Sequence, residues 1–196
     1  MKHKKSEVTR ARIIAAAKEL FLEKGFDDTS VAEICRVSGV SNGALFHQFK
    51  VKEDIAFEVF SDVRALFWDR IIAALVAEDD PLIGIEAAVK ASFAFQRENP
   101  GGAAFIKDVT GSKWIERYAA DSRIQYDSGV ERGLEWAQPH LQAGRLHSTS
   151  PDTFITLVSG APQWIGRMIR IGMATSTLDE IEGELARFIS RAFRPD

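Results

Sequence analysis

The chain has 196 residues, of which 45% are hydrophobic, and this is enough to bury a sizeable core in one large or two modest domains. Its apolar stretches are interrupted by charged residues, so we expect neither a signal peptide nor a membrane-spanning helix, and we expect a cytoplasmic protein. The single cysteine, Cys35, excludes an internal disulfide and is compatible with a reducing compartment.

The net charge of -3 is distributed unevenly along the chain. Residues 1–53 carry 10 Lys and Arg against 7 Asp and Glu, whereas residues 54–196 carry 15 against 21. A basic amino-terminal segment on an acidic body is typical of a protein that meets a polyanion at one end. Charged runs are also common on solvated faces without any partner, so the charge pattern alone leaves nucleic-acid binding open.

Apolar residues recur at helical spacing throughout, which predicts an all-α protein of about nine helices. We expect the first helix from residue 6 or 9 to residue 24, followed by a left-handed stop at a glycine. Ser30 and Glu33 form a capping box that begins a second, short helix ending near residue 38. A third short helix is expected after Ser41. These three helices make up the amino-terminal part of the predicted fold.

The remaining helices are longer. A fourth is expected over residues 52–77, and Asp80 followed by Pro81 begins a fifth that ends before residue 99. Residues 105–109 and 114–142 are expected to form two or three more, with Pro139 ending or kinking the last. Ser150 and Pro151 begin a helix that we expect to reach residue 172, and Thr177 with Glu180 forms a second capping box before the final helix.

Residues 30–49 are the most informative segment, because two short helices joined by a tight turn amount to a helix-turn-helix. Gly39 can take the backbone angles that such a turn needs. The outer face of the second helix carries polar side chains, and in this motif that helix lies in the major groove of DNA. Two short helices joined at a glycine are also common in helical bundles, so the turn alone is compatible with either interpretation.

The residues around the turn resemble a known family. They are Ala16-Ala17, Phe21, Gly25-Phe26, Thr29-Ser30, Ile34, Ser38-Gly39-Val40-Ser41, Gly43, Leu45-Phe46, Phe49 and Lys52-Glu53. In this order and spacing, the segment from Ile13 to Ile55 closely resembles the DNA-binding domain of the TetR family of regulators. The resemblance implies a three-helix helix-turn-helix domain over residues 1–53 and a larger helical domain for ligand binding and dimerisation over residues 54–196.

The resemblance also implies DNA contacts. Thr29 or Ser30 and Lys52 match positions that touch phosphates, which a helix amino terminus favours in any case. The recognition helix is matched by Ser41, Asn42, Gly43, Ala44, Phe46 and His47. Phe46 stands where the family usually has tyrosine, so a phenolic hydroxyl contact is lost. Basic residues near the amino terminus, including Lys2, Lys4, Lys5, Arg10 and Arg12, are expected to form either an arm along the DNA or a mobile tail.

Fifteen of the 19 aromatic residues follow residue 54, as expected for a core or for an apolar ligand site. The candidate ligand-binding residues are Trp68, Phe93, Phe105, Trp114, Tyr118, Trp136 and Trp164. A flat or weakly polar organic compound is the expected ligand. Acidic residues such as Glu116 or Asp121 would favour a cation.

The last two helices match the pair through which the family dimerises as a four-helix bundle. The candidate dimerisation residues are Leu157, Ala161, Ile165 and Met168 on the first, and Ile181, Leu185 and Phe188 on the second. Pro162 is expected to kink the first helix of the pair. The alternative is that both helices only pack internally.

We therefore predict a ligand-responsive transcriptional regulator, a repressor that binds a palindromic operator as a homodimer and dissociates when a small, mostly apolar molecule binds. No catalytic residue, metal site or cofactor is expected, because the four histidines lack metal-ligand spacing and no phosphate-binding glycine loop is present. A helical adaptor that binds protein, without sequence-specific DNA binding, is the alternative.

Overall fold

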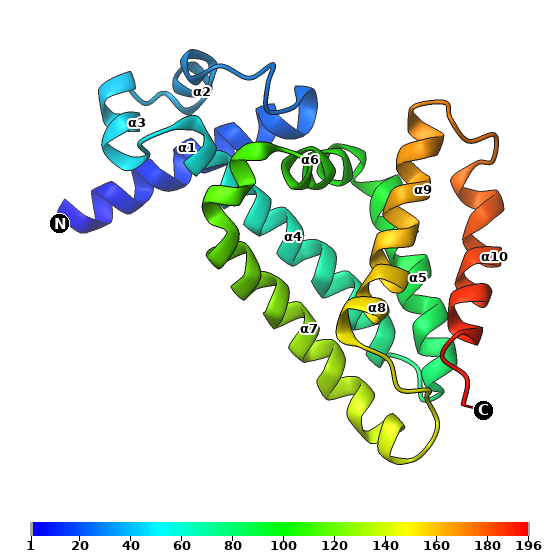
Figure 1. Ribbon diagram of the computed structural model, residues 1–196. Helices are drawn as coiled ribbons and strands as arrows, with labels where there is room; N and C mark the ends of the chain where they lie inside the picture. Colours follow the sequence, from blue (N-terminus) through cyan, green and yellow to red (C-terminus); the bar gives the residue numbers. More distant parts are fainter. Residues whose placement is uncertain (1, 196) are drawn as a thin grey trace. The chain divides into compact units, whose positions relative to one another are not determined.

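The computed structural model describes residues 2–195, except for the side chains of residues 2–5, 122–128 and 130. The described residues form ten α-helices and no strand, which confirms the all-α prediction and adds one helix to the nine expected (Figure 1). Within this described range, every helix is too short or too polar to cross a membrane.

The chain divides into two compact units. Unit 1 comprises Met1–Arg64 and Gly101–Ser122, and unit 2 comprises Ala65–Pro100 and Arg123–Asp196. The expected boundary between residues 53 and 54 does not coincide with this division. The first segment of unit 1 ends at Arg64, inside a helix, and residues 101–122 belong to unit 1 again. A single boundary along the sequence could not describe a unit made of two separate segments.

Unit 1 is built from short helices around one end of a long one. Its elements are α1 (Lys2–Lys24), α2 (Val31–Ser38), α3 (Asn42–Gln48), the first part of α4 (Lys52–Val76), α6 (Pro100–Thr110) and the 3₁₀ helix η1 (Lys113–Tyr118). Ile13, Ile34 and Leu45 are fully buried where the first three helices meet. Phe105 of α6 stacks on Phe21 of α1, with 5.5 Å between the ring centres. These buried side chains form the core of the helix-turn-helix.

One glycine allows α6 to pack against α1. A Cβ atom added to Gly101 would lie 2.1 Å from the carbonyl oxygen of Leu22, a distance that no side chain can adopt. The helix also begins earlier than the expected residue 105, because Pro100 occupies its first position, where a missing N–H costs nothing.

Unit 2 contains the second part of α4 together with α5 (Pro81–Glu98), α7 (Ala119–Gln142), α8 (Pro151–Ile155), α9 (Ala161–Arg170) and α10 (Leu178–Arg191). Helix α10 packs along α5, where the Ser190 hydroxyl donates to the carbonyl of Leu82 at 2.8 Å. Helix α9 packs on the same helix at Gly166, whose missing side chain leaves room for Gln96. Helices α9 and α10 thus both pack against α5.

Most helix starts follow the expected capping signals. The capping boxes at Ser30 and Thr177 are both complete. The expected helix over residues 151–172 is instead interrupted by a π-helical turn, η2 (Thr156–Gly160), just before Pro162. Proline has no N–H to continue an α-helical ladder, so the extra residue of a π turn accommodates it. Pro139 does not end α7, which continues to Gln142.

Candidate nucleic-acid interface and ligand cavity

Helix α3 has one exposed side and one buried side. The Ser41 hydroxyl caps the helix by accepting the backbone N–H of Ala44 at 3.3 Å. The exposed residues are Ser41, Asn42, Gly43, Phe46 and His47, whereas Ala44 is half-buried. No atom lies within 4 Å of a Cβ added to Gly43, so the surface there is open. This is the face on which base contacts were expected.

The turn before α3 is held by an arginine from α1. Gly39 ends α2 in the left-handed conformation, with φ of 62°. Arg12 donates to the carbonyl oxygen of Ser38 at 2.6 Å, which places a cation at the negative end of α2. Gln48 donates to the Ser6 hydroxyl at 2.9 Å and ties α3 to α1 in the same way. The angle between α2 and α3 is thus fixed by side chains of α1.

Two residues of the expected basic arm, Arg10 and Arg12, bind partners within the protein instead of extending as an arm. Arg12 caps α2, and Arg10 pairs with Glu58 at 2.8 Å while its guanidinium lies 4.6 Å from the centre of the Phe49 ring. Both cations are thus engaged by unit 1 itself. The side chains of Lys2, Lys4 and Lys5 lie outside the described residues.

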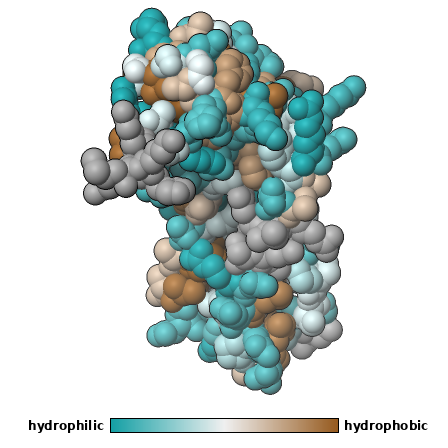
Figure 2. Space-filling view, turned by 90° about the vertical axis from the view of Figure 1, so that its left-hand side faces the viewer, coloured by the Kyte–Doolittle hydropathy of each residue, from teal (hydrophilic) through white to brown (hydrophobic). Residues whose placement is uncertain are grey.

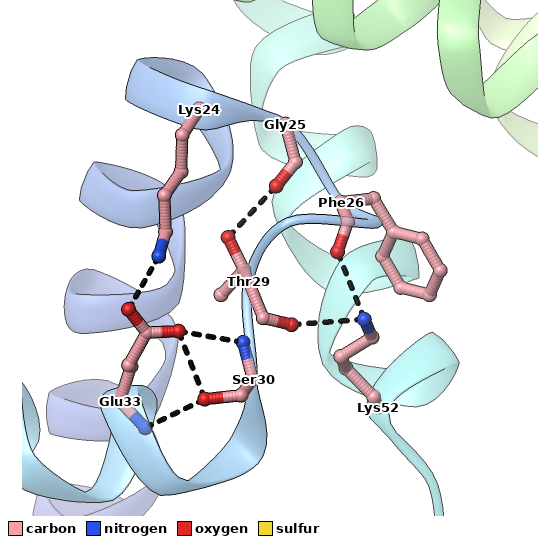
Figure 3. Close-up of polar contacts among 7 residues, drawn as sticks. All are labelled: Lys24, Gly25, Phe26, Thr29, Ser30, Glu33 and Lys52. Atoms are coloured by element: carbon pink, nitrogen blue, oxygen red, sulfur yellow. Dashed lines mark hydrogen bonds and ion pairs between the residues drawn. The ribbon is translucent and has the colours of Figure 1, made fainter.

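The start of α2 is a closed hydrogen-bonded group (Figure 3). The Ser30 backbone N–H donates to the Glu33 carboxylate at 2.9 Å, and the Ser30 hydroxyl accepts from the Glu33 backbone. Lys24 donates to the other oxygen of the same carboxylate. The hydrogen bond from Lys24, followed by those from Ser30, lowers the pKa of Glu33 to about 2.

Thr29 and Lys52 form a second set of hydrogen bonds beside this group (Figure 3). Thr29 is buried, and its hydroxyl donates to the carbonyl oxygen of Gly25 at 2.7 Å. Lys52 donates to the carbonyl oxygens of Phe26 and Thr29 at 2.8 and 2.9 Å, and its ammonium lies 4.0 Å from the centre of the Phe26 ring. Lys52 therefore holds the loop before α2 against the first turn of α4.

These contacts bear on the expected phosphate contacts. The Thr29 side chain is not placed to contact a phosphate, because its hydroxyl is buried and already donates to Gly25. Ser30 is exposed, and its contact remains a prediction. Lys52 already donates two hydrogen bonds, so any phosphate would share the ammonium with the Phe26 and Thr29 carbonyls.

Three of the expected ligand residues lie in unit 1. Phe105 stacks on α1, and Trp114 packs 5.3 Å from the Phe26 ring. The Tyr118 hydroxyl donates to Asp54 at 2.6 Å, and its ring stacks on Phe57 with 4.5 Å between centres. None of the three therefore lines the apolar cavity of unit 2 described below, and their contact with a ligand stays a prediction.

The contact between Tyr118 and Asp54 shapes the turn between α3 and α4. Burial by itself would raise the pKa of Asp54, but hydrogen bonds from Tyr118 and from the backbone N–H groups of Val51 and Lys50 outweigh it and lower the pKa. For Tyr118, burial and then the bond to Asp54 raise the pKa. The carboxylate thus remains ionised, and the phenol neutral, at neutral pH.

Unit 2 contains an apolar cavity between α4 and α7. Trp68, Ile71 and Leu75 line it from α4, while Gly129, Gly133 and Ala137 line it from α7. These three small residues recur every four positions and share one face of α7. At Gly129 the Trp68 ring of α4 packs against this face, 3.2 Å from where a Cβ atom would lie, whereas Gly133 is less closely packed. This four-residue spacing is visible in the sequence. It could have indicated the α7 side of the cavity, which the choice of aromatic residues did not.

The cavity is small as it stands. About 40 Å³ is open to the centre of a water molecule, and one water needs roughly 10–15 Å³ of such space. An organic ligand would therefore have to move part of the wall. Polar groups are few, and the polar side chains among the described lining residues are His147 and Thr149.

The other expected ligand residues lie elsewhere in unit 2. Among all seven, only Trp68 lines this cavity in the described part of the chain. Phe93 is fully buried in α5, and Trp136 packs 5.0 Å from the His140 ring. Trp164 is 64% exposed on α9. The residues that we missed include Phe154, Phe193 and the small residues of α7.

The expected dimerisation residues lie on an open surface of α9, α10 and the turn before them. Six are half-buried in the single chain, namely Leu157, Ala161, Ile165, Met168, Ile181 and Leu185. Phe188 is 73% exposed. We call these apolar residues of η2, α9 and α10, together with Trp164, the α9–α10 face. On the side of the molecule shown in Figure 2, hydrophilic and hydrophobic residues are interspersed.

Comparison with known proteins identifies the same amino-terminal segment. Residues 13–59 match the family model described as bacterial regulatory proteins, tetR family. The chain is 32% identical over 133 residues to the HTH-type transcriptional regulator UidR of Escherichia coli K12, covering 60% of this chain and 68% of that protein. It is also 38% identical over 50 residues to the regulator QacR of Staphylococcus aureus, covering 26% of this chain and 27% of that one.

Solved structures share the fold along the whole chain. A TetR family transcription regulator from Marinobacter aquaeolei covers 100% of both chains, with a TM-score of 0.72 and 18% identity. NalD, the secondary repressor of the MexAB-OprM multidrug efflux pump in Pseudomonas aeruginosa, covers 98% of this chain and 99% of its own, with a TM-score of 0.65 and 20% identity. At these identities, the likeness concerns the fold.

Proposed function

Because the chain belongs to the TetR family of transcriptional regulators, we propose that it binds a palindromic operator as a homodimer and represses transcription until an effector binds unit 2. The observation that carries this proposal is the exposed row on α3, mounted on a helix-turn-helix whose turn is closed by Arg12 and Gly39. In this motif the second helix lies in the major groove, where its exposed residues contact base edges.

Within this row, Asn42 and Phe46 are the residues that we propose to read bases. An asparagine can donate to and accept from the adenine edge, and an apolar ring can contact the methyl group of thymine. Gly43, one residue after Asn42, lets the DNA approach the helix backbone. Ser30, Ser41, His47 and Lys52 are assigned to the backbone of the operator, where contacts position the protein without reading sequence.

Dimerisation is assigned to the α9–α10 face. Trp164 and Phe188 expose large apolar rings, which a solvated surface does not favour but an interface core does. Two recognition helices roughly one DNA turn apart would match a palindrome, since the symmetry of a dimer matches that of its site. The adaptor alternative is not favoured, because the relatives named above are transcriptional regulators.

The effector is assigned to the apolar cavity of unit 2. Helix α4 lines it with Trp68, Ile71 and Leu75, and the same helix begins at Lys52 beside the loop that precedes α2. An effector that widens the cavity would displace a wall that continues as one helix into unit 1. If the DNA-bound state disfavours that displacement, effector binding lowers the affinity for DNA. Because coupling between two binding sites is reciprocal, DNA binding then lowers the affinity for the effector by the same factor.

A fluorescence binding assay tests the DNA-binding part. The chain would be titrated onto labelled DNA from the region flanking its own gene, and bound regions would then be footprinted. Protection of a palindromic segment by a dimer supports the proposal. Equal binding to every segment at one salt concentration contradicts it. A regulator of this kind acts on chromosomal DNA, so the cytoplasmic location remains a prediction that accompanies the proposal.

A further inference from the structure

The walls of the cavity in unit 2 restrict the charge of its ligand. Among the described residues, those that line the cavity include no aspartate, glutamate, lysine or arginine. An ion placed there would lose much of its hydration without gaining an opposite charge, which makes its burial unfavourable. The described walls therefore favour a neutral molecule.

The polar side chains of the cavity stand together in the sequence. His147 and Thr149 lie on the segment between α7 and α8, His147 exposed and Thr149 half-buried. The backbone N–H of His147 donates to the carbonyl of Phe193 at 2.8 Å and is therefore already engaged. The imidazole of His147 and the hydroxyl of Thr149 are thus the groups at this end that could hydrogen-bond a ligand.

Aromatic rings line the remaining wall. Trp68, Phe154 and Phe193 all face the cavity, and the two phenylalanines lie 5.4 Å apart with their planes at 66°. The small residues Gly129 and Gly133 lie on the α7 side. Rings of a ligand can stack on or pack edge-to-face with such residues, which adds to the burial of apolar area.

We propose that this cavity binds an uncharged compound with a flat apolar ring system and one hydrogen-bonding group, the ring held beside Trp68 and the polar group at His147 and Thr149. This chemistry replaces the cation considered from the sequence, since Glu116 and Asp121, the expected partners of a cation, belong to unit 1. The biological role of the ligand rests on the proposed function, but its binding to the cavity does not require DNA.

Four ligands with one ring system test the charge rule. Calorimetric titration of the full chain at neutral pH would compare naphthalene, 1-naphthol, (1-naphthylmethyl)ammonium and 1-naphthoate. We expect 1-naphthol to bind, and both ions to bind at least ~10-fold more weakly, because the described lining offers neither ion an opposite charge. Binding of either ion as tightly as 1-naphthol overturns the proposal, and so does the failure of 1-naphthol to bind.

Gly133 offers a matched pair of variants that locates the ligand. A Cβ atom added there would lie 3.8 Å from the ring of Phe154, an ordinary contact, so Gly133→Ala fits. Gly133→Leu projects three more carbon atoms into the space. We expect the alanine variant to bind 1-naphthol and the leucine variant to lose it, with both remaining folded by circular dichroism. Unchanged binding by the leucine variant overturns the location.

The polar end is tested by a double variant with similar shape. His147→Leu combined with Thr149→Val removes both hydrogen-bonding side chains. In the unchanged protein we expect 1-naphthol to bind about 3- to 10-fold more tightly than naphthalene, the range of a single hydrogen bond. In the double variant that preference is expected to disappear through loss of 1-naphthol affinity. A preference that persists unchanged overturns the assignment of these two residues.

The same ligands separate this inference from the proposed function. Anisotropy of labelled operator DNA would be followed while 1-naphthol is added. If 1-naphthol binds the cavity but the DNA remains bound, the ligand class stands and release by this ligand is wrong. If 1-naphthol binds neither the free chain nor the complex while the free chain still binds its operator, the ligand class is wrong and DNA binding stands.

Discussion

The two compact units use their side chains in opposite ways. In unit 1, hydrogen bonds between segments are made by Arg12, Lys52 and Gln48. The exposed residues of α3 are on the same helix as Leu45, which is fully buried. In unit 2, small residues leave a cavity open and large rings remain at the surface. Sequence-specific reading of DNA requires a fixed arrangement, whereas a ligand-responsive unit requires space that something else can fill.

The largest contrast is expected between two glycines. Gly101→Ala in unit 1 forces a methyl group onto the backbone of α1, because the added Cβ would lie 2.1 Å from the Leu22 oxygen. We expect a loss of about 3 kcal/mol in the free energy of unfolding, the upper end of the usual cost of overpacking. Gly133→Ala in unit 2 makes only an ordinary contact, 3.8 Å from the Phe154 ring, and should stabilise α7 by about 0.5–1 kcal/mol. Denaturation in urea measures both, and equal effects would contradict the contrast.

The second test concerns the exposed rings of unit 2. Trp164→Glu combined with Phe188→Glu places charges on the α9–α10 face. We expect the dimer to weaken by about 100-fold or more, since each ring removed from an interface core forfeits roughly 1.5–3 kcal/mol. Sedimentation velocity measures the change. The control is Ile83→Glu, which alters another exposed apolar residue of unit 2, 52% exposed on α5. If the control weakens the dimer equally, the assigned face is wrong.

The sequence predicted unit 1 well because its signals are local. The capping box at Ser30, the left-handed Gly39 and the cap at Ser41 depend on residues a few positions away. The predicted ligand site depended instead on long-range packing. Tyr118 stacks on Phe57, and Phe105 on Phe21, across segments far apart in the chain. Aromatic character alone could not distinguish a ring in such a core from one lining a cavity.

The electrostatic assignments failed for a related reason. Arg10 and Arg12 were candidates for an arm on DNA because their charge is visible in the sequence. Their partners, Glu58 and the carbonyl oxygens at the end of α2, become visible only when the helices pack. By contrast, the four-residue spacing of Gly129, Gly133 and Ala137 was present from the start and marks the cavity more directly than the tryptophans do.

The third test separates two roles of Lys52. Lys52→Met keeps the apolar stem but removes the bonds to Phe26 and Thr29, so we expect a loss of about 1 kcal/mol in stability, discounted because the ammonium is partly exposed. If the ammonium also contacts a phosphate, operator binding should weaken for all sequences and its salt dependence should become shallower by about one counterion. An unchanged salt dependence would assign Lys52 to the loop alone.

The smallest effect is expected at Glu33, through acid. Its pKa is lowered to about 2, below the ordinary value of 4.5, so its contribution to stability is present above pH 4.5 and is lost as the pH falls toward 2. Glu33→Gln removes this dependence. We therefore expect the melting temperatures of the two proteins to differ most above pH 5 and to converge in acid. A gap that stays constant from pH 6 to pH 2.5 would show that ionised Glu33 does not stabilise α2.

The central claim is that the fixed face of α3 reads a DNA sequence. The most direct measurement compares the affinity of the chain for its footprinted operator and for a scrambled duplex at one salt concentration, with Asn42→Ala as the variant. We expect the operator to bind at least ~10³-fold more tightly than the scrambled duplex, and the variant to lose part of this ratio while binding the scrambled duplex unchanged. Equal affinity of the unchanged protein for both duplexes would contradict it.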